Sequence, residues 1–337
     1  MLKRLLLLAP LLAWAGLAQA GTLDNVKQKG YVTCGVNVGL GGFSMPDSHG
    51  VWRGLDVDAC RAVAAAVFGD ANKVKYVPLT SVSRFTALQS GEVDILSRNT
   101  TFTFLRDATI GLRMVMVNFY DGQGFLVRKD AKIKHLEDMA DGTICMLQGS
   151  THEMNLADWM KQHNISFHVV LLDTTDVLIK ALLSGRCDAA SSDGSNLASI
   201  RGAGLPNPDD YVILPDRISK EPLGPMVRRG DDQWEDVVRW SMMAMVEAEE
   251  LGITSANVDQ MLAESQNPTV QRLLGKSGDF GKLIGLDNAW TYNVIKQVGN
   301  YGEAFERNVG MGSSLKLERG ENALWTKGGM MYAIPFR

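Results

Sequence analysis

The sequence predicts an α/β protein of two lobes, with two strand-like crossings between them and a C-terminal extension. Strand-like apolar runs alternate with helix-period runs in two successive rounds, which is typical of parallel sheets covered by helices. The 337-residue chain is also longer than one hydrophobic core usually supports. Two lobes, each with its own sheet, are therefore expected.

The N-terminus has the pattern of a secretory signal. Lys3 and Arg4 precede an apolar run over 5–17, and Ala18-Gln19-Ala20 forms a small-x-small cleavage site. We expect residues 1–20 to be removed after Ala20 and the rest to be exported. The residue directly after the cleavage site is Gly21 and not a cysteine, so no lipid anchor is expected, and no later apolar run is long enough to span a membrane. An uncleaved helical anchor is the alternative.

The first lobe is expected to comprise residues 21–123 together with 222–252. Its first round of elements predicts strands at 31–38, 73–79 and 93–97, with helices at 56–68 and 82–89 between them. Gly69 and Gly91 stand where these helices end. The returning chain forms an amphipathic helix over 231–250 on the same lobe.

The second lobe is expected over 124–221. It repeats the pattern, with strands at 143–147, 166–172 and 187–191 and helices at 151–162, 175–183 and 194–204. Segments 122–127 and 221–227 are extended and rich in Gly or Pro, so they are predicted to be the two hinge crossings. Residues 253–337 form the C-terminal extension, which is expected to pack on the first lobe.

The chain contains four cysteines, Cys34, Cys60, Cys145 and Cys187. Thiols of exported proteins tend to oxidise, and four cysteines allow three pairings. We favour Cys34–Cys60 and Cys145–Cys187, because each joins a strand to a nearby element of one lobe, whereas a cross pairing would tie the lobes together. A zinc site is the competing interpretation. Neither a Cys-x-x-Cys motif nor histidines at metal-ligand spacing supports it, so no metal is expected.

Composition and motifs argue against several classes of function. The formal net charge of −4 gives no reason to expect nucleic acid as a partner. The glycine-rich segment 39–42 lacks the spacing of a nucleotide-binding loop, so no cofactor is expected. Ser313-x-x-Lys316 matches a penicillin-binding motif, but its companion motifs do not follow it. We interpret that match as chance.

Three separated segments together complement a zwitterion. Segment 97–106 supplies the guanidinium of Arg106, segment 148–153 a hydroxyl-rich helix start, and segment 189–193 the carboxylate of Asp193. A free α-amino acid needs such donors for its carboxylate and such an acceptor for its ammonium. Each feature also has a structural interpretation: Arg106 as a surface charge, Ser150-x-x-Glu153 as a capping box, and Asp193 as a helix N-cap.

Four motifs in this order and spacing resemble the periplasmic solute-binding proteins of amino-acid ABC transporters, family 3. They are 50–58, 87–94, the Thr-rich segment ending at Arg106, and 147–151. The four cysteines and the tail ending at 325–333 are similar to the general L-amino-acid-binding subfamily. The resemblance implies a type II periplasmic binding fold, a periplasmic location, an inner-membrane permease as partner, and no enzymatic activity.

The resemblance also implies residue roles. Arg106 and Thr101 would hold the ligand α-carboxylate, Ser150 and Thr151 would add donors, and Asp193 would accept from the ammonium. Leu40 and Ser81 stand where relatives often carry two aromatics, and Asn37 where relatives that prefer cationic ligands carry an acid. Broad specificity is therefore expected, with Asn99, Leu40 and Ser81 lining the side-chain space. The alternative is a periplasmic lyase or dehydratase on the same fold, for which no general acid or base is identified.

Overall fold

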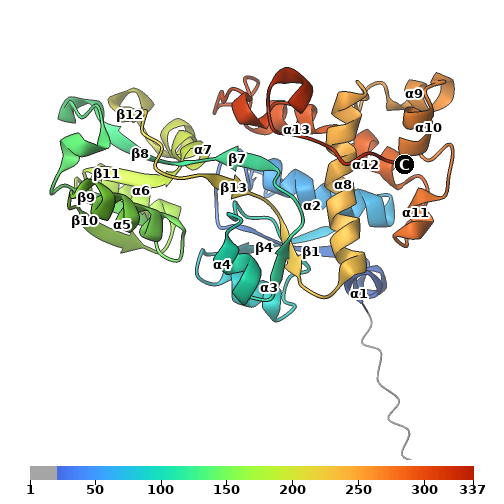
Figure 1. Ribbon diagram of the computed structural model, residues 1–337, viewed down its shortest axis with the longest axis horizontal. Coiled ribbons are helices and arrows are strands. Elements are labelled where there is room, and N and C mark those ends of the chain that lie inside the picture. The colour runs from blue at the N-terminus through green and yellow to red at the C-terminus, as the bar shows by residue number, and fades with distance from the viewer. Residues whose placement is uncertain (1–20) are drawn as a thin grey trace, which may run out of the picture.

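The computed structural model describes residues 21–337, so the predicted signal at 1–20 lies outside the described residues. Figure 1 shows two α/β bodies joined by a pair of extended strands, with the helices of the C-terminal region gathered beside the first body. Within 21–337, every helix is too short or too polar to cross a membrane. The two-lobe α/β class predicted from the sequence is the observed one.

The first sheet has the strand order β4-β1-β5-β14-β6. β1 runs parallel to β4 and β5, whereas β14 is antiparallel to β5 and β6. All six residues of β1 are buried, as expected for a strand covered on both faces. The bounds are β1 Val32–Asn37, β4 Val74–Leu79, β5 Ile95–Leu96, β6 Leu112–Met114 and β14 Met226–Arg228, and a separate hairpin pairs β2 Met45–Pro46 with β3 Trp52–Arg53.

Helices cover the first sheet. The alanine-rich α2 packs against β1 and against the long helix α8, and it ends at Gly69, whose positive φ of 68° suits glycine. The Cys34–Cys60 disulfide joins β1 to α2. The helices of this lobe are α1 Thr22–Lys29, α2 Leu55–Phe68, α3 Arg84–Gln89, α4 Phe104–Thr109 and α8 Asp232–Glu250.

The second sheet has the order β10-β9-β11-β8-β12. Along β8, Leu126 points into one core cluster while Phe125 and Val127 point into another, which is the two-residue period of a strand buried on both faces. The second predicted disulfide, Cys145–Cys187, also forms. The bounds are β8 Gln123–Arg128, β9 Thr143–Leu147, β10 His168–Leu172, β11 Ala189–Asp193, β12 Tyr211–Ile213, α5 His152–His163, α6 Thr175–Leu183 and α7 Gly194–Ser199, with short helical turns at Lys129–Ala131, Leu136–Met139, Ile200–Gly204 and Pro208–Asp210.

One helix of this lobe is shorter than predicted. The sequence predicts a helix over 194–204, but α7 ends at Ser199 and a wider π-helical turn follows over Ile200–Gly204. Gly202 and Gly204 lie in this turn, and glycine is a poor former of helix interiors.

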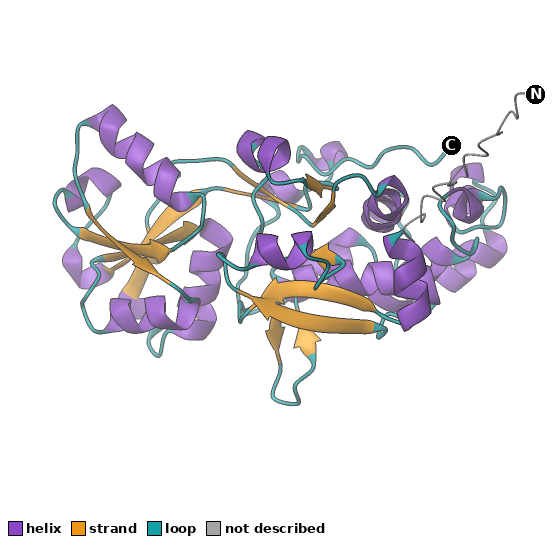
Figure 2. Cartoon of the chain, turned by 90° about the horizontal axis from the view of Figure 1, so that it is seen from below, coloured by secondary structure: helices purple, strands orange, loops and turns teal. Residues whose placement is uncertain are grey.

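Two short strands connect the lobes. β7 (Phe119–Asp121) and β13 (Glu221–Leu223) pair antiparallel and run side by side between the two bodies in Figures 1 and 2. The sequence predicts the first crossing at 122–127, but that segment lies mostly in β8 and pairs with β11 and β12 of the second sheet. The prediction was wrong because the sequence pattern of an apolar strand is the same whether the strand crosses a hinge or joins a sheet.

The C-terminal extension shares its hydrophobic core with the first lobe. Trp290, Phe305 and Phe336 belong to the same buried cluster as Val32 of β1. The Asn322 side chain also reaches the crossing strand β7, where it contacts Tyr120. The extension contains α9 Val258–Glu264, α10 Pro268–Leu273, α11 Phe280–Leu283, α12 Trp290–Val298 and α13 Tyr301–Asn308, with short turns at Gly320–Asn322 and Trp325–Lys327.

Candidate ligand-binding site

A polar pocket lies between the two lobes. It encloses about 360 Å³, counting the space that opens to solvent. The first lobe contributes Asn37, Ser81, Arg84, Arg98, Asn99 and Thr101, and the second contributes Leu147, Ser150, Thr151, His152, Ser192, Asp193 and Asn196. A ligand held here would touch both lobes at once.

Six of the predicted site residues line this pocket: Ser81, Asn99, Thr101, Ser150, Thr151 and Asp193. Arg106 lies next to it, and its Nη1 donates to the Thr101 carbonyl at 2.9 Å. Leu40 lies elsewhere. The Leu40 side chain is 2% exposed in the core of the first lobe and borders a different hollow, because its main chain pairs with Ser44 in a tight loop.

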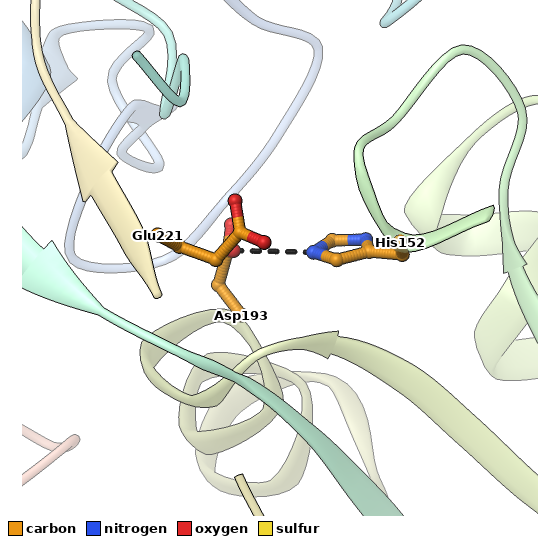
Figure 3. Close-up of side chains that lie close together, drawn as sticks. All are labelled: His152, Asp193 and Glu221. Carbon is orange, nitrogen blue, oxygen red and sulfur yellow. Dashed lines mark hydrogen bonds and ion pairs between the residues drawn. The ribbon is translucent and has the colours of Figure 1, made fainter. Parts of the chain in front are cut away.

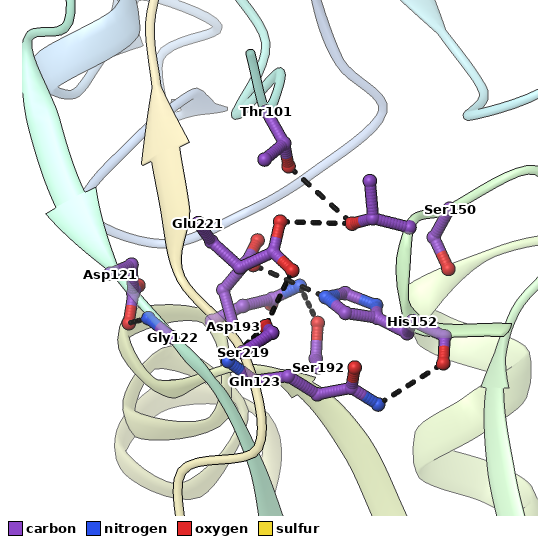
Figure 4. Close-up of polar contacts among 12 residues, drawn as sticks. Thr101, Asp121, Gly122, Gln123, Ser150, His152, Ser192, Asp193, Ser219 and Glu221 are labelled. Atoms are coloured by element: carbon purple, nitrogen blue, oxygen red, sulfur yellow. Dashed lines mark hydrogen bonds and ion pairs between the residues drawn. The ribbon is translucent and has the colours of Figure 1, made fainter. Parts of the chain in front are cut away.

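A chain of hydroxyl contacts crosses the pocket from lobe to lobe. Thr101 Oγ1 lies 3.5 Å from Thr151 Oγ1, and Thr151 Oγ1 donates to Glu221 Oε2 at 2.9 Å. Figure 4 shows this chain. The other Glu221 oxygen accepts from Asn155 Nδ2 and Ser219 Oγ, both at 2.7 Å. Glu221 at the end of the hinge is therefore held in place by partners within and beside the second lobe.

Asp193 occupies the N-cap position of α7 but does not cap it. Its side chain accepts no hydrogen bond from that helix. Asp121 of β7 accepts from the Gly194 and Ser195 N–H groups instead, each at 3.0 Å. Both N–H groups belong to the first turn of α7, which lacks intrahelical acceptors, and that of Ser195 is one that an N-cap side chain normally satisfies. The Asp193 carboxylate is consequently free to face the pocket.

His152 is the partner of that carboxylate. Its Nε2 lies 3.1 Å from Asp193 Oδ1, and its Nδ1 is buried without a hydrogen-bond partner. Burial alone favours the neutral imidazole, but the negative charges of Asp193, Glu221 and Asp121 outweigh it and raise the pKa of His152. Figure 3 shows His152 approaching Asp193 and Glu221 from the opposite side of the pocket.

Asp121 is itself perturbed by this cluster. Burial, followed by the charge of Asp193, raises the pKa of Asp121 to about 6. Two carboxylates this close repel each other when both are ionised. A cation placed near Asp193 would relieve that repulsion.

His152, Asp193 and Glu221 could also serve as metal ligands. Within 21–337, they are the one group of His, Cys, Asp or Glu residues whose ligand atoms lie close enough to share an ion, all within 4.8 Å of one another. Both Glu221 oxygens already accept hydrogen bonds from neighbours. The carboxylate oxygens of Asp193 and Glu221 in this group are also suitable acceptors for a ligand ammonium group.

The predicted capping box around Ser150 does not form. α5 begins at His152 with Thr151 at its N-cap position, one residue later than that motif requires. Ser150 Oγ donates to the Leu147 carbonyl at 2.7 Å, and Glu153 accepts from the Gly149 N–H at 2.6 Å. Main-chain N–H groups at this helix start therefore remain available to an anion.

Four residues at the site are not among those that the sequence predicts: His152, Glu221, Arg84 and Arg98. His152 directly follows Ser150-Thr151, and Glu221 is a charged residue in a predicted crossing, so both positions carried a usable signal. Arg98 adjoins Asn99, but Arg84 stands in a stretch that reads as an ordinary helix. Their convergence depends on how the lobes meet.

Comparisons with known proteins agree with this architecture. Residues 32–256 match the bacterial extracellular solute-binding proteins, family 3. The chain belongs to this family. It is 53% identical to the general L-amino acid-binding periplasmic protein AapJ of Rhizobium johnstonii, over 98% of this chain and 96% of that protein. It is 54% identical to the glutamate/glutamine/aspartate/asparagine-binding protein BztA of Rhodobacter capsulatus, over 96% of this chain and 95% of that protein.

A solved structure supports the same assignment. The ABC transporter periplasmic binding protein from Brucella ovis with glutathione bound superposes with a TM-score of 0.92 at 50% identity, covering 95% of this chain and all of that one. The fold is therefore the two-lobe fold of periplasmic binding proteins, as the family resemblance implied.

Proposed function

We propose that this protein binds free L-amino acids in the periplasm and delivers them to an inner-membrane ABC permease. The observation that carries the proposal is the carboxylate of Asp193, which faces the pocket because Asp121 caps α7 in its place. Arg106 and the helix start at Ser150 and Thr151 supply donors for a carboxylate. Together these groups complement a zwitterion.

The relatives support the class of ligand and the location. AapJ and BztA are named as binding proteins for amino acids, and AapJ as periplasmic. Delivery to a permease is proposed because the chain resembles the solute-binding proteins of ABC transporters. That role requires a protein that binds without changing its ligand, so we propose no enzymatic activity.

Closure of the lobes is the proposed mechanism. A ligand that touches Thr101 on one lobe and Asp193 on the other gains both sets of contacts only when the lobes are closed. Such differential affinity shifts the equilibrium between open and closed forms. β7 and β13, the two short crossings, are where the main chain would bend.

Broad specificity is also proposed. Asn37 and Ser81 line the pocket with small polar side chains and offer no aromatic clamp. Glutathione belongs among the candidates, because the Brucella ovis structure holds it and its glutamyl end is itself a free α-amino acid.

A thermal-shift screen of the common L-amino acids and glutathione tests the proposal. Ligands that bind only the native state raise the melting temperature, and we expect several chemically different L-amino acids to do so. Sugars and zinc chloride serve as the competing classes. A response to sugars or zinc alone would overturn the proposal.

A variant of Arg106 tests whether this residue binds the α-carboxylate of the ligand. Arg106→Lys keeps the charge but loses the two-pronged geometry of the guanidinium. We expect calorimetry to show affinity for a responding amino acid reduced by about 10-fold or more. Unchanged affinity would remove Arg106 from the site.

The lyase alternative has one observation in its favour, since His152 beside Asp193 could act as an acid or base. Incubation of each bound amino acid with the protein, followed by NMR, separates the two functions. We expect every ligand to be recovered unchanged. Appearance of an elimination product would support the lyase.

A further inference from the structure

Two arginines line the pocket beyond the groups assigned to the α-carboxylate and the ammonium. The Arg98 side chain is held in place by hydrogen bonds within the protein. Its Nε donates to the Leu79 carbonyl at 2.7 Å and its Nη2 to Ser81 Oγ at 3.2 Å. The buried carboxyl of Asp56 also acts on it electrostatically. Arg98 therefore has a structural role that needs no ligand.

Arg84 is different, because the protein gives its guanidinium few hydrogen-bond partners, although the Phe85 ring centroid lies 4.7 Å from its central carbon. It begins helix α3, and its side chain is 3% exposed. Its Nη2 donates to the Gly149 carbonyl at a long 3.4 Å, and its Nε is buried without any hydrogen-bond partner. A buried donor without a partner is costly, above all in a charged group.

Nearby positive charges further destabilise the charged form of Arg84. Burial lowers the pKa of Arg84, and the like charges of Arg98 and Arg106 lower it further, ahead of the opposing effects of Asp193 and Glu221. Glu221 and Asp193 bond to Thr151 and His152 respectively, and within 21–337 Arg84 forms no ion pair with either carboxylate. An anion supplied from outside would neutralise this guanidinium.

Asn99 offers a second unsatisfied group in the same pocket. Both its amide nitrogen and its amide oxygen are buried without partners. Its main chain also adopts a left-handed φ of 39°, a conformation that is uncommon for residues other than glycine. The backbone therefore holds this amide at the pocket at a conformational cost.

We infer that Arg84, assisted by the Asn99 amide, receives a second carboxylate of the ligand. The site accordingly prefers L-amino-acid ligands that carry two carboxylates over ligands of the same size that carry one. This inference rests on the proposed function, in which Arg106 takes the α-carboxylate and Asp193 the ammonium. Two sources share this chemistry: the acidic amino acids and γ-glutamyl peptides such as glutathione.

Calorimetry on the full mature protein tests the preference directly. Glutamine matches glutamate in size but has an amide in place of the side-chain carboxylate. The ratio of the two affinities therefore measures the contribution of that second carboxylate. We expect glutamate to bind about 10- to 100-fold more tightly than glutamine. Glutathione and its glycyl amide form a second pair, and a gap there without one between glutamate and glutamine would identify a peptide as the source.

Variants assign the effect to Arg84. In Arg84→Gln we expect the difference in affinity between glutamate and glutamine, here called the gap, to disappear. It should do so through weaker binding of glutamate, with glutamine affinity changing much less. Arg84→Lys keeps the charge and should retain part of the gap. Arg53→Gln is the matched control, because Arg53 is an exposed arginine of the same lobe that pairs with Asp47. The gap measured in this control variant should equal that of the wild type.

The outcomes separate this inference from the proposed function. If no amino acid or glutathione binds, the proposed function fails. If amino acids bind but neither pair shows a gap in the wild type, the second-carboxylate preference alone is overturned. A gap that survives in Arg84→Gln overturns the assignment to Arg84. Should that variant fail to fold by circular dichroism, the wild-type pairs and Arg84→Lys still decide.

Discussion

The amide of Asn322 forms hydrogen bonds with both main-chain groups of Tyr120. The Tyr120 N–H donates to Asn322 Oδ1 at 2.7 Å, and Asn322 Nδ2 donates to the Tyr120 carbonyl at 3.0 Å. Tyr120 is the central residue of the crossing strand β7, where it stands opposite Pro222 of β13. Asn322 thus acts as a short strand partner on one edge of the hinge, and it fastens the C-terminal extension to the segment that would bend on closure.

Asn322→Ala should lower the stability of the protein. The change removes two hydrogen bonds and leaves the Tyr120 main-chain groups unpaired, so we expect a loss of about 1–3 kcal/mol in the free energy of unfolding. Denaturant unfolding measures it. Gln266→Ala is the control, because Gln266 is exposed in the extension and bonds only to the nearby Glu264 carbonyl. Equal stability of the two variants would show that the contact with Tyr120 contributes nothing.

Asp193→Asn should weaken amino-acid binding more than Asp121→Asn does, while α7 persists in both variants. Asp193→Asn removes the charge opposite the ligand ammonium while leaving the cap of α7 to Asp121. We expect amino-acid affinity to fall by about 2–5 kcal/mol, while the circular dichroism of the free protein shows that its helices persist. Calorimetry and circular dichroism supply the two readouts.

Asp121→Asn is the matched variant. The Gly194 and Ser195 N–H groups donate to different oxygens of Asp121. Asn keeps one acceptor oxygen and so retains one of these two bonds, and α7 should persist. Because Asp121 lies beside the ammonium site without lining it, we expect a smaller loss of affinity than in Asp193→Asn. A larger loss in Asp121→Asn would place the ammonium at that carboxylate instead.

Amino-acid affinity should rise with pH through the range in which His152 loses its proton. In the free protein the charge of Asp193 raises the pKa of His152 above its ordinary value, although burial opposes this. A bound ammonium would take over the Asp193 carboxylate, which lowers the pKa of His152 in the complex and makes binding release a proton. Protonation of His152 therefore opposes binding, and alkaline pH relieves that opposition.

Calorimetry in buffers of different ionisation enthalpy measures this proton release. Asp121, with a pKa raised to about 6, belongs to the same cluster and contributes to the profile, and the charge of Glu221 also acts on His152. His152→Gln isolates the imidazole, because glutamine can still donate to Asp193 but does not titrate. The rise in affinity at pH values above the ordinary histidine pKa of about 6.5 should disappear in that variant. A slope that persists unchanged would assign it to the carboxylates.

The mature protein should contain no free thiol. Peptide mapping without reduction should recover Cys34 linked to Cys60 and Cys145 linked to Cys187, as the structure shows. Replacing both Cys145 and Cys187 by serine opens a loop with a sequence separation of 42, for which the chain-entropy relation predicts a loss of about 3–4 kcal/mol. Denaturant unfolding of the double variant against the oxidised wild type checks the value, and equal midpoints would contradict it.

The sequence by itself determined the succession of elements. β9 at Thr143–Leu147 and α6 at Thr175–Leu183 have the bounds that the apolar pattern predicts, because periodicity is a local property that survives packing. The disulfide pairing could also be predicted, since each bond lies within one lobe. Most of the predicted ligand residues, such as Thr101 and Thr151, meet at one pocket because the family resemblance reflects the same fold.

Only the tertiary structure decided what each polar side chain does in that pocket. From the sequence, Asp193 can be interpreted as a helix cap or as a ligand-binding group. The structure decides between them, because Asp121 of the distant strand β7 accepts the hydrogen bonds from the first N–H groups of α7. The sequence does not show that Arg84 lies near Arg98 and Arg106, or that within 21–337 it forms no ion pair with a carboxylate. A side chain's partners and its desolvation depend on segments that fold against it, and those segments are far away in the sequence.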